Sequence, residues 1–439
     1  MAALTIRSIS AQSGHFSRRC IWRRGLYKAV RYEIACVLRV GLPFCNHARG
    51  IFHLLLSRGG GTRRASSRRG LRSNHSALAQ HLLSFAQQEL AENAGYTAET
   101  HEVVTEDGYI LQMHRITGSE KSPKADNKPA VLLVHGLLDC SATWVLASPE
   151  KGLGFLLSNW GYDVWMGNVR GTRYARKHKW MTTKDKEYWS FSWHEMGMYD
   201  LPAMIDYILA TNKQQKILYA GHSQGSTSFF VMASERPEYQ KKIAAMFALA
   251  PATFMSRSTS VLFNLLGSDQ KLLSTKVFLS LRNKFPKMRH CLTWPMWFNP
   301  LISSMVFYSQ TLIPDIVQYD PAGASTRQFV HYAQLMHSGN FEQYDHGLVG
   351  NLNKYGQIHP PKYDLGSVKI PVYLHYGSKD VFVNVKDLYQ LYKALPNAQK
   401  FLVPAKAFTH LDFVWSKRTD TLVYNKILSL MQRHRSSLA

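Results

Sequence analysis

The sequence predicts an α/β fold, in which a mostly parallel β-sheet carries helices on both faces and a helical cap is inserted late in the chain. Three observations lead to this prediction. Short apolar runs alternate with amphipathic helical stretches between residues 130 and 250, a rhythm typical of a parallel sheet covered by helices. One of these runs leads into a glycine-flanked serine turn at residues 221–225. From residue 77 to residue 436 the chain is also long enough to bury a large core without disulfides.

The expected elements follow one another in chain order. Residues 105–115 read as a hairpin or as paired strands around Glu106-Asp107-Gly108. A helix is expected after the serine turn, and another over residues 384–395. Because the carboxyl ends of parallel strands lie along one edge of a sheet, the loops after these strands are expected to meet there. The predicted strands after the hairpin are residues 130–134, 217–220, 246–250, 370–376 and 401–404.

Residues 221–225 read Gly-His-Ser-Gln-Gly, directly after the apolar run 217–220. In a strand-to-helix turn of this pattern, the serine is held in a strained backbone conformation with its hydroxyl exposed at the end of the sheet. A Cβ atom at Gly221 or Gly225 would collide with the neighbouring strand or helix. We therefore predict that Ser223 is a nucleophile, against the alternative of a tight glycine turn with an incidental serine.

A serine hydroxyl needs a histidine base, and usually a carboxylate that orients this base. In hydrolases built on this turn, the chain order is serine, then acid, then histidine. Asp380 follows the predicted strand 370–376, and His410 follows the predicted strand 401–404. The sequence thus predicts a catalytic triad of Ser223, Asp380 and His410.

Other residues compete for these roles, since the chain has 19 histidines. His222 precedes the serine and is expected to be a packing or oxyanion-side residue, and His375 lies within a predicted strand and is expected in the core. Asp412 is a rival for the acid. Its position two residues from His410 makes alignment with the far ring nitrogen difficult, which favours Asp380.

The mechanism also needs backbone N–H groups that face the oxyanion of the tetrahedral intermediate. One donor is expected from the residue after the nucleophile, Gln224. The other is expected from the loop after the strand 130–134, where His135-Gly136-Leu137-Leu138 follows. Gly136 allows the loop to turn, and Leu137 is the predicted donor; the alternative is an ordinary turn at a strand end.

With this serine turn and this order of triad residues, the sequence resembles the acid lipase family, the group of gastric lipase and lysosomal acid lipase. The resemblance covers about residues 95–430. The matching stretches are residues 102–111, 135–138 with Ser141 and Trp144, 161–171, 199–203, 221–225, 321–325, 338–341 with Tyr344 and Asp345, and 410–413.

The resemblance implies an α/β-hydrolase fold with an eight-stranded sheet. It also implies a serine esterase that cleaves triacylglycerols or cholesteryl esters without a metal ion or organic cofactor, with Ser223, Asp380 and His410 as its triad. Two alternatives stay open. One is a carboxylesterase that acts on smaller esters, and the other is a lid-bearing lipid-binding protein without turnover.

The apolar pattern changes between residues 253 and 318, which are dense in Met, Leu, Phe and Trp but lack the strand–helix rhythm. This composition predicts a helical cap over the strand ends that carry Ser223. Surfaces rich in Met and aromatic side chains suit a long, variable acyl chain. We expect the cap to act as a lid over an apolar substrate, although most of these side chains would pack the core of the cap itself.

Residues 1–76 differ from the rest of the chain. Residues 1–73 contain fifteen Lys or Arg and the single acid Glu33, so this leader holds about +14 of the formal net charge of +24. A basic, Ser-rich segment with almost no acid is typical of an organellar transit peptide, and it is expected to be unpacked. The resemblance implies secretion or the lysosome instead. A mitochondrial transit segment and a mis-joined upstream exon are the alternatives.

The net charge outside the leader indicates which kinds of partner the protein could bind. The hydrolase part retains about +10, so a basic face could attract an anionic membrane or lipid-droplet surface for transient contact, or the charge could simply solubilise the protein. A nucleic-acid partner is not expected, because much of the excess charge lies in the leader and no recognition motif accompanies it. No run of apolar residues reaches the length of a membrane span.

Overall fold

A computed structural model describes residues 88–260 and 312–438 of the 439-residue chain. The leader (1–76) lies wholly outside these residues, as does most of the predicted cap (253–318). The strands are β1 (Thr97–Val104), β2 (Tyr109–Gly118), β3 (Ala130–Val134), β4 (Asp163–Gly167), β5 (Lys177–His178), β6 (Ile217–His222), β7 (Ile243–Leu249), β8 (Val372–Tyr376) and β9 (Ala398–Leu402). The α-helices are α4 (Leu153–Asn159), α5 (Trp193–Glu195), α6 (Leu201–Asn212), α7 (Gln224–Glu235), α12 (Ile313–Tyr319), α13 (Thr326–Ser338), α14 (Gly347–Tyr355), α15 (Val385–Ala394), α16 (Asp412–Trp415) and α17 (Asn425–Arg433).

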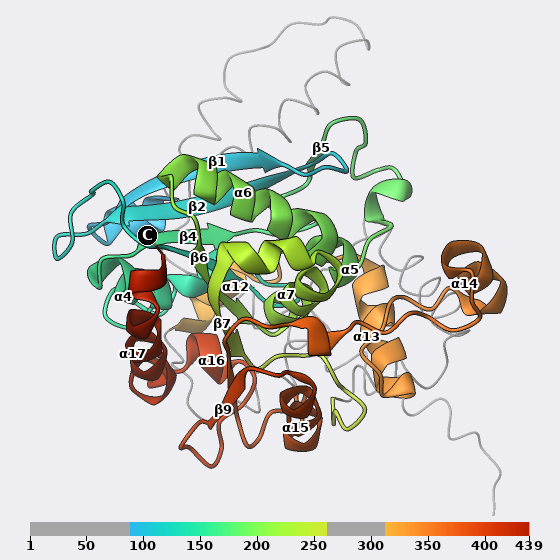
Figure 1. Cartoon of the computed structure of the whole chain (residues 1–439). Helices are drawn as coiled ribbons and strands as arrows, with labels where there is room; N and C mark the ends of the chain where they lie inside the picture. The colour runs from blue at the N-terminus through green and yellow to red at the C-terminus, as the bar shows by residue number, and fades with distance from the viewer. Residues whose placement is uncertain (1–87, 261–311, 439) are drawn as a thin grey trace, which may run out of the picture. The chain divides into compact units, whose positions relative to one another are not determined.

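The strands form one sheet in the order β1-β2-β4-β3-β6-β7-β8-β9, with the short strand β5 paired to β2 (Figure 1). From β4 to β9 every neighbouring pair is parallel, whereas β1–β2 and β2–β4 are antiparallel. The prediction of a mostly parallel sheet is therefore confirmed. The expected eight strands are present, and the two-residue β5 adds a ninth.

The central strands β3, β4, β6, β7 and β8 are buried at every residue. Such strands need cover on both faces of the sheet, which explains their continuous apolar sequences. Helix α7 packs against β6, α6 packs against β1 and β3, and α4 packs against β2 and β4. The described residues include no helix long and apolar enough to cross a bilayer.

The strand predicted over 130–134 has its expected bounds, whereas four others differ by a few residues. Strand β6 extends to His222, β7 covers Ile243–Leu249 rather than 246–250, and β8 begins at Val372 rather than at residue 370. The shift of β9 has a clear reason. The apolar run Phe401–Val403 suggested a strand over 401–404, but β9 covers Ala398–Leu402. The reason is that β9 is the edge strand: it pairs in parallel with β8 from Val372–Ala398 to Tyr376–Leu402, and Leu402 is 52% exposed. An edge strand is defined by its backbone hydrogen bonds more than by burial, so its sequence pattern is weak.

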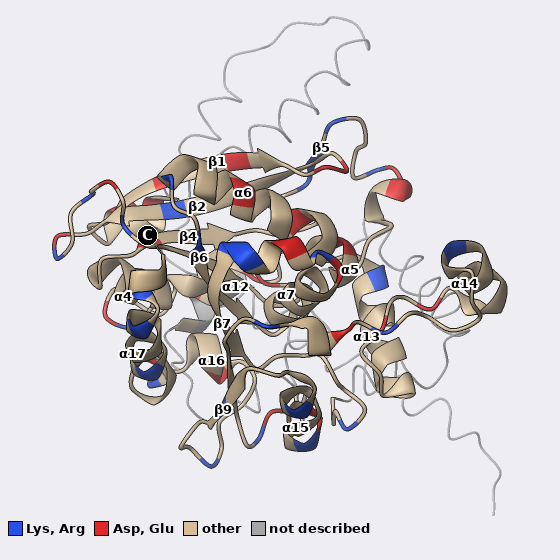
Figure 2. Cartoon of the chain, viewed as in Figure 1, with Lys and Arg blue, Asp and Glu red and all other residues tan. Residues whose placement is uncertain are grey.

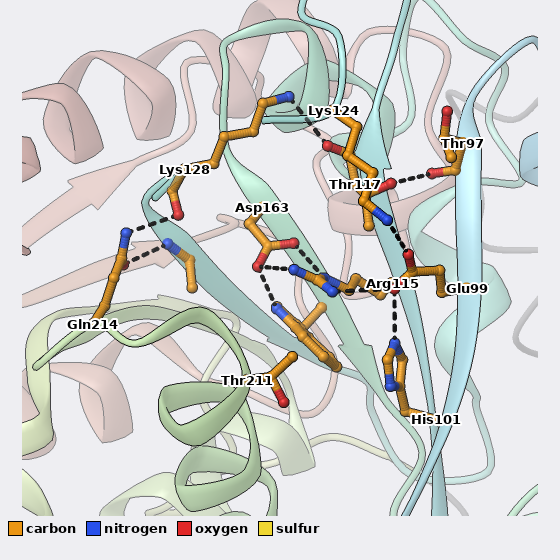
Figure 3. A network of polar contacts seen from close by, with 12 residues as sticks. Thr97, Glu99, His101, Arg115, Thr117, Lys124, Lys128, Asp163, Thr211 and Gln214 are labelled. Carbon is orange, nitrogen blue, oxygen red and sulfur yellow. Dashed lines mark hydrogen bonds and ion pairs between the residues drawn. The ribbon is translucent and has the colours of Figure 1, made fainter. Parts of the chain in front are cut away.

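Polar contacts fasten the antiparallel end of the sheet to its parallel part (Figure 3). The Arg115 guanidinium on β2 donates from Nε to Asp163 Oδ1 on β4 at 2.7 Å and from Nη1 to Glu99 Oε2 on β1 at 3.0 Å. Glu99 also accepts from Lys124 at 2.6 Å. Desolvation of the guanidinium opposes its charge, yet the two carboxylates raise the pKa of Arg115 on balance. One cation thus links three strands.

Candidate active site

Ser223 occupies a sharp turn between β6 and α7. Its backbone angles are φ 50° and ψ −113°, which place a non-glycine residue in a sparsely populated region. Such a conformation costs about 1–3 kcal/mol and persists only where the surrounding structure imposes it. The amide of Ser223 donates to Leu249 O at the end of β7 at 2.8 Å, which holds the turn against the sheet. The side chain is largely buried, with 8% of the residue exposed.

The glycines on either side of the turn are required by close approach. A Cβ atom on Gly221 would lie 2.6 Å from the carbonyl carbon of Gly225, at the start of the following helix. A Cβ atom on Gly225 would press into the carbonyl oxygen of Val134 at the end of β3. The collisions expected from the sequence therefore occur with the helix at one glycine and with the strand at the other.

Asp380 and His410 meet on the loops that follow β8 and β9. His410 Nδ1 lies 2.7 Å from Asp380 Oδ2, with the two side chains 7% and 1% exposed. Asp380 Oδ1 accepts from the amides of Phe382 at 2.8 Å and Val383 at 2.9 Å, so its carboxylate is fixed by the backbone. The ring of Phe382 lies 4.8 Å from that of His410. The carboxylate can thus hold the imidazole in one tautomer and orientation.

The histidine loop is in contact with the serine turn through His222. His222 Nε2 lies 3.0 Å from the carbonyl oxygen of His410, and the centroids of the two rings are 4.9 Å apart. Within the described residues, no hydrogen bond joins Ser223 to His410. In hydrolases without substrate, this contact is often long and tightens only in the reacting complex.

Two other candidates weighed in the sequence take different positions. Asp412 Oδ2 accepts from the amide and the hydroxyl of Thr409, both at 2.7 Å, so this carboxylate fixes the loop rather than the ring of His410. His375 is buried within β8 and stacks on Phe401 with ring centroids 5.1 Å apart. Burial lowers the pKa of His375 to about 3, so the ring is neutral at physiological pH.

The loop after β3 lies against the serine turn. A Cβ atom on Gly136 would lie 3.1 Å from His222 Nδ1 and 3.3 Å from Ser223 Cβ, so only a glycine fits here without displacement. The next residues are Leu137, partly buried against the core, and Leu138 with φ 71°.

The amides of Leu137 and Gln224 are both available for an oxyanion. Within the parts of the chain that the structure describes, neither amide donates to a protein acceptor. Gln224 is the first residue of α7, where an amide has no partner within the helix. An unpaired amide at a helix N-terminus favours negative charge nearby.

Buried histidines behind the loop hold it in place as neutral groups. His135 Nδ1 lies 2.8 Å from Gly136 O, and His135 Nε2 accepts from the amide of Val169 at 3.3 Å. Burial lowers the pKa of His135 to about 4 and lowers the pKa of His222 well below its usual value. Both rings are therefore neutral at neutral pH.

The sequence analysis missed a pair of buried acids beside this loop. The carboxylates of Asp139 and Asp320 and the thiol of Cys140 lie within 4.8 Å of one another. Among the described residues they form the one cluster of three such groups close enough to hold a metal ion. Burial raises the pKa of Asp139 to about 7, and burial and the charge of Asp139 raise the pKa of Asp320 well above its usual value. A shared proton therefore satisfies the pair near neutral pH. No sequence signal links residues 181 positions apart.

This pair joins the loop to the segment that returns from the predicted cap. The amide of Ala322 donates to Leu138 O at 2.6 Å, and Cys140 Sγ donates to Tyr319 O at 3.8 Å. The Arg173 guanidinium donates to the carbonyls of Gln318 and Pro321 at 3.0 and 2.8 Å. The position of Leu137 thus depends on chain segments far apart in the sequence.

A strained serine between a parallel strand and a helix, with a carboxylate–imidazole pair on the loops after later strands, is the arrangement of the α/β hydrolases. A family model described as "alpha/beta hydrolase fold" matches residues 129–415, and one described as "Partial alpha/beta-hydrolase lipase region" matches residues 87–148.

Within the α/β hydrolases, the curated proteins that resemble this chain are lipases. Lipase 3 of Drosophila melanogaster is 40% identical over 364 residues, which cover 79% of this chain and 92% of that protein. Gastric triacylglycerol lipase of Homo sapiens is 34% identical over 361 residues, with 78% and 89% covered. Lipase member N of Homo sapiens is 35% identical over 356 residues, with 77% and 89% covered. The chain belongs to the acid lipase family of α/β hydrolases, and it is an ester hydrolase.

Proposed function

We propose that this protein hydrolyses the carboxylic ester bonds of triacylglycerols or cholesteryl esters by a two-step acyl transfer on Ser223. The observation that carries the proposal is the 2.7 Å pair of Asp380 and His410 beside a serine in a strained strand-to-helix turn. The curated relatives named above include a triacylglycerol lipase, which supports a lipid ester as the substrate.

In the first step, His410 removes the proton of the Ser223 hydroxyl as the oxygen attacks the ester carbonyl. The amides of Leu137 and Gln224 donate to the oxyanion of the tetrahedral intermediate. A donor of this kind contributes about 3–4 kcal/mol to the stability of a transition state. His410 then protonates the departing alcohol, which leaves the acyl group on Ser223.

In the second step, a water molecule loses its proton to His410 and attacks the acyl-enzyme, which releases the fatty acid. Asp380 holds the protonated Nδ1 side of the ring in both steps and stabilises the imidazolium that forms. The proposal requires no metal ion or organic cofactor. The cap at residues 253–318 is proposed to close over the acyl chain.

Hydrolysis rates on triolein, cholesteryl oleate and a short-chain soluble ester test the substrate proposal. We expect the long-chain lipid esters to be cleaved with higher kcat/KM than the short ester. A clear preference for the short ester would favour a carboxylesterase of small substrates instead. Deletion of residues 256–315 is expected to raise activity on short esters relative to long-chain esters, and an unchanged chain-length profile would contradict the role of the cap.

A further inference from the structure

Helix α14 exposes its apolar side chains. Leu348, Val349 and Leu352 are 62%, 67% and 44% exposed, and Ile358, in the segment after the helix, is 50% exposed. Leu348 and Leu352 are neighbours on one helix face, since they are four residues apart. In a soluble helix this face normally packs on the core. A group of exposed apolar residues of this kind marks an interaction surface.

The polar side of the helix is the side fastened to the protein. Asn351 is 2% exposed, and its Nδ2 donates to Asp345 Oδ1 and to Ile358 O, both at 2.8 Å. Asn351 Oδ1 accepts from the amide of His346 at 2.9 Å. These bonds fix the rotation of the helix and hold Ile358 beside it. The outward direction of the apolar residues is therefore built into the local structure.

The helix is carried on a stem of two paired chain segments. The amide of Gln343 donates to Pro361 O at 2.8 Å, and the amide of Tyr363 donates to Phe341 O at 3.0 Å. Figure 1 shows α14 at the periphery, beyond α13 and away from the sheet. The stem continues from α13, whose Tyr332 hydroxyl lies 3.1 Å from Thr227 Oγ1 on α7, the helix that begins at the serine turn. The surface is thus connected through α13 to the helix that begins at the candidate active site.

The helix and the segment that follows it carry only basic charges, and the nearest acids in sequence, Asp345 and Asp364, flank this segment. Between residues 346 and 363 the sequence contains Lys354 and Lys362 and no acidic residue, and both lysines are exposed. Figure 2 shows a basic segment and no acidic segment on α14, whose one charged residue is Lys354. Exposed apolar side chains next to lysines match the two parts of an anionic lipid surface: acyl chains below and negatively charged headgroups above.

We propose that Leu348, Val349, Leu352 and Ile358, together with Lys354, form an anchor that inserts into an anionic lipid surface and holds the enzyme on its substrate phase. The inference rests on the proposed function for its purpose, but the binding itself needs no catalysis. The apolar side chains supply the insertion, and the lysine supplies selectivity for anionic headgroups.

The test is flotation of the full-length chain with phosphatidylcholine vesicles, with and without phosphatidylserine. The wild type is expected to float with vesicles that contain phosphatidylserine. Leu348→Asp with Val349→Asp is expected to lower this binding about tenfold or more, because two charges enter the inserted face. Lys354→Glu is expected to weaken binding only where phosphatidylserine is present. Leu402→Asp, on the exposed edge strand β9, is the matched control and is expected to bind like the wild type.

Each result has a defined meaning. Equal binding by the wild type and the Asp double variant overturns the proposal, as does an equal loss in Leu402→Asp. No flotation of the wild type with either vesicle also overturns it, and would make a protein partner the better occupant of the surface. Leu348→Ser with Val349→Ser, a milder change on exposed positions, must reproduce the loss while its melting temperature stays that of the wild type. Ester hydrolysis reports on the proposed function separately. Hydrolysis of a short soluble ester is expected to be unchanged in all these variants, and a wild type that cleaves neither this ester nor triolein or cholesteryl oleate would refute the proposed function without affecting the binding result.

Discussion

The buried pair Asp139 and Asp320 predicts a specific dependence of stability on pH. Burial raises the pKa of Asp139 to about 7 from a usual value of 3.8. A group whose pKa is higher in the folded state stabilises the fold at low pH and loses this contribution as pH rises through the folded value. Because pH 5 is about two units below the folded pKa of Asp139, protonation of the pair contributes about 3 kcal/mol to the stability of the fold at this pH. At pH 8 this contribution is almost absent.

Asp139→Asn isolates the effect, because an amide can donate to the Asp320 carboxylate without taking up a proton. Urea unfolding of the wild type and the variant at pH 5 and pH 8 gives two differences in the free energy of unfolding. We expect the free energy of unfolding of the variant, relative to that of the wild type, to be about 3 kcal/mol higher at pH 8 than at pH 5. Asp206→Asn, which changes an exposed carboxylate on α6, is the control and should show no such gain. A difference that is the same at both pH values would refute the shared-proton interpretation, and a gain in wild-type stability on addition of a divalent cation would indicate a metal ion instead.

Three further predictions follow from single sites. Arg170→Met leaves the fully buried Asp200 carboxylate without the guanidinium that lies 2.7 Å from it. The free energy of unfolding, measured in urea, should therefore fall by about 3–5 kcal/mol. A decrease below about 1 kcal/mol would contradict this prediction. Because burial already raises the pKa of Asp200 to about 6, the variant should recover part of its stability as pH falls from 7 to 5. Asp380→Asn should lower kcat by about 10³–10⁴, whereas Asp412→Asn should retain most of the kcat, and the reverse ranking would reassign the acid. Gly225→Ala should lower the free energy of unfolding by about 1–3 kcal/mol or more and reduce ester hydrolysis, since the alanine Cβ would collide with Val134 O. A melting temperature equal to that of the wild type would refute the close approach.

The sequence predicted the parts of the site that depend on local pattern. The turn at Ser223 could be predicted because the sharp strand-to-helix connection requires glycine at fixed positions, and Gly221 and Gly225 make the contacts that demand it. Asp380 and His410 could be paired because parallel strands end at one edge of the sheet, and their side chains are 2.7 Å apart.

Other features depend on contacts that no local pattern records. The approach of Asp139 to Asp320 results from the return of the chain after the predicted cap, which no local pattern encodes. The outward direction of the apolar face of α14 could not be predicted either. Helical periodicity shows which residues share this face, but not whether the face points to the core or to solvent. Buried hydrogen bonds of Asn351 decide that direction.

The central claim is that the Ser223 hydroxyl is the nucleophile, and covalent labelling tests it most directly. Incubation of the full-length protein with a fluorophosphonate probe, followed by mass spectrometry of the peptides, identifies the modified side chain. We predict one adduct, on Ser223, with loss of ester hydrolysis in proportion to labelling, and no adduct in Ser223→Ala. An active protein that the probe leaves unmodified at Ser223, or a Ser223→Ala variant that still turns over ester, would contradict the account.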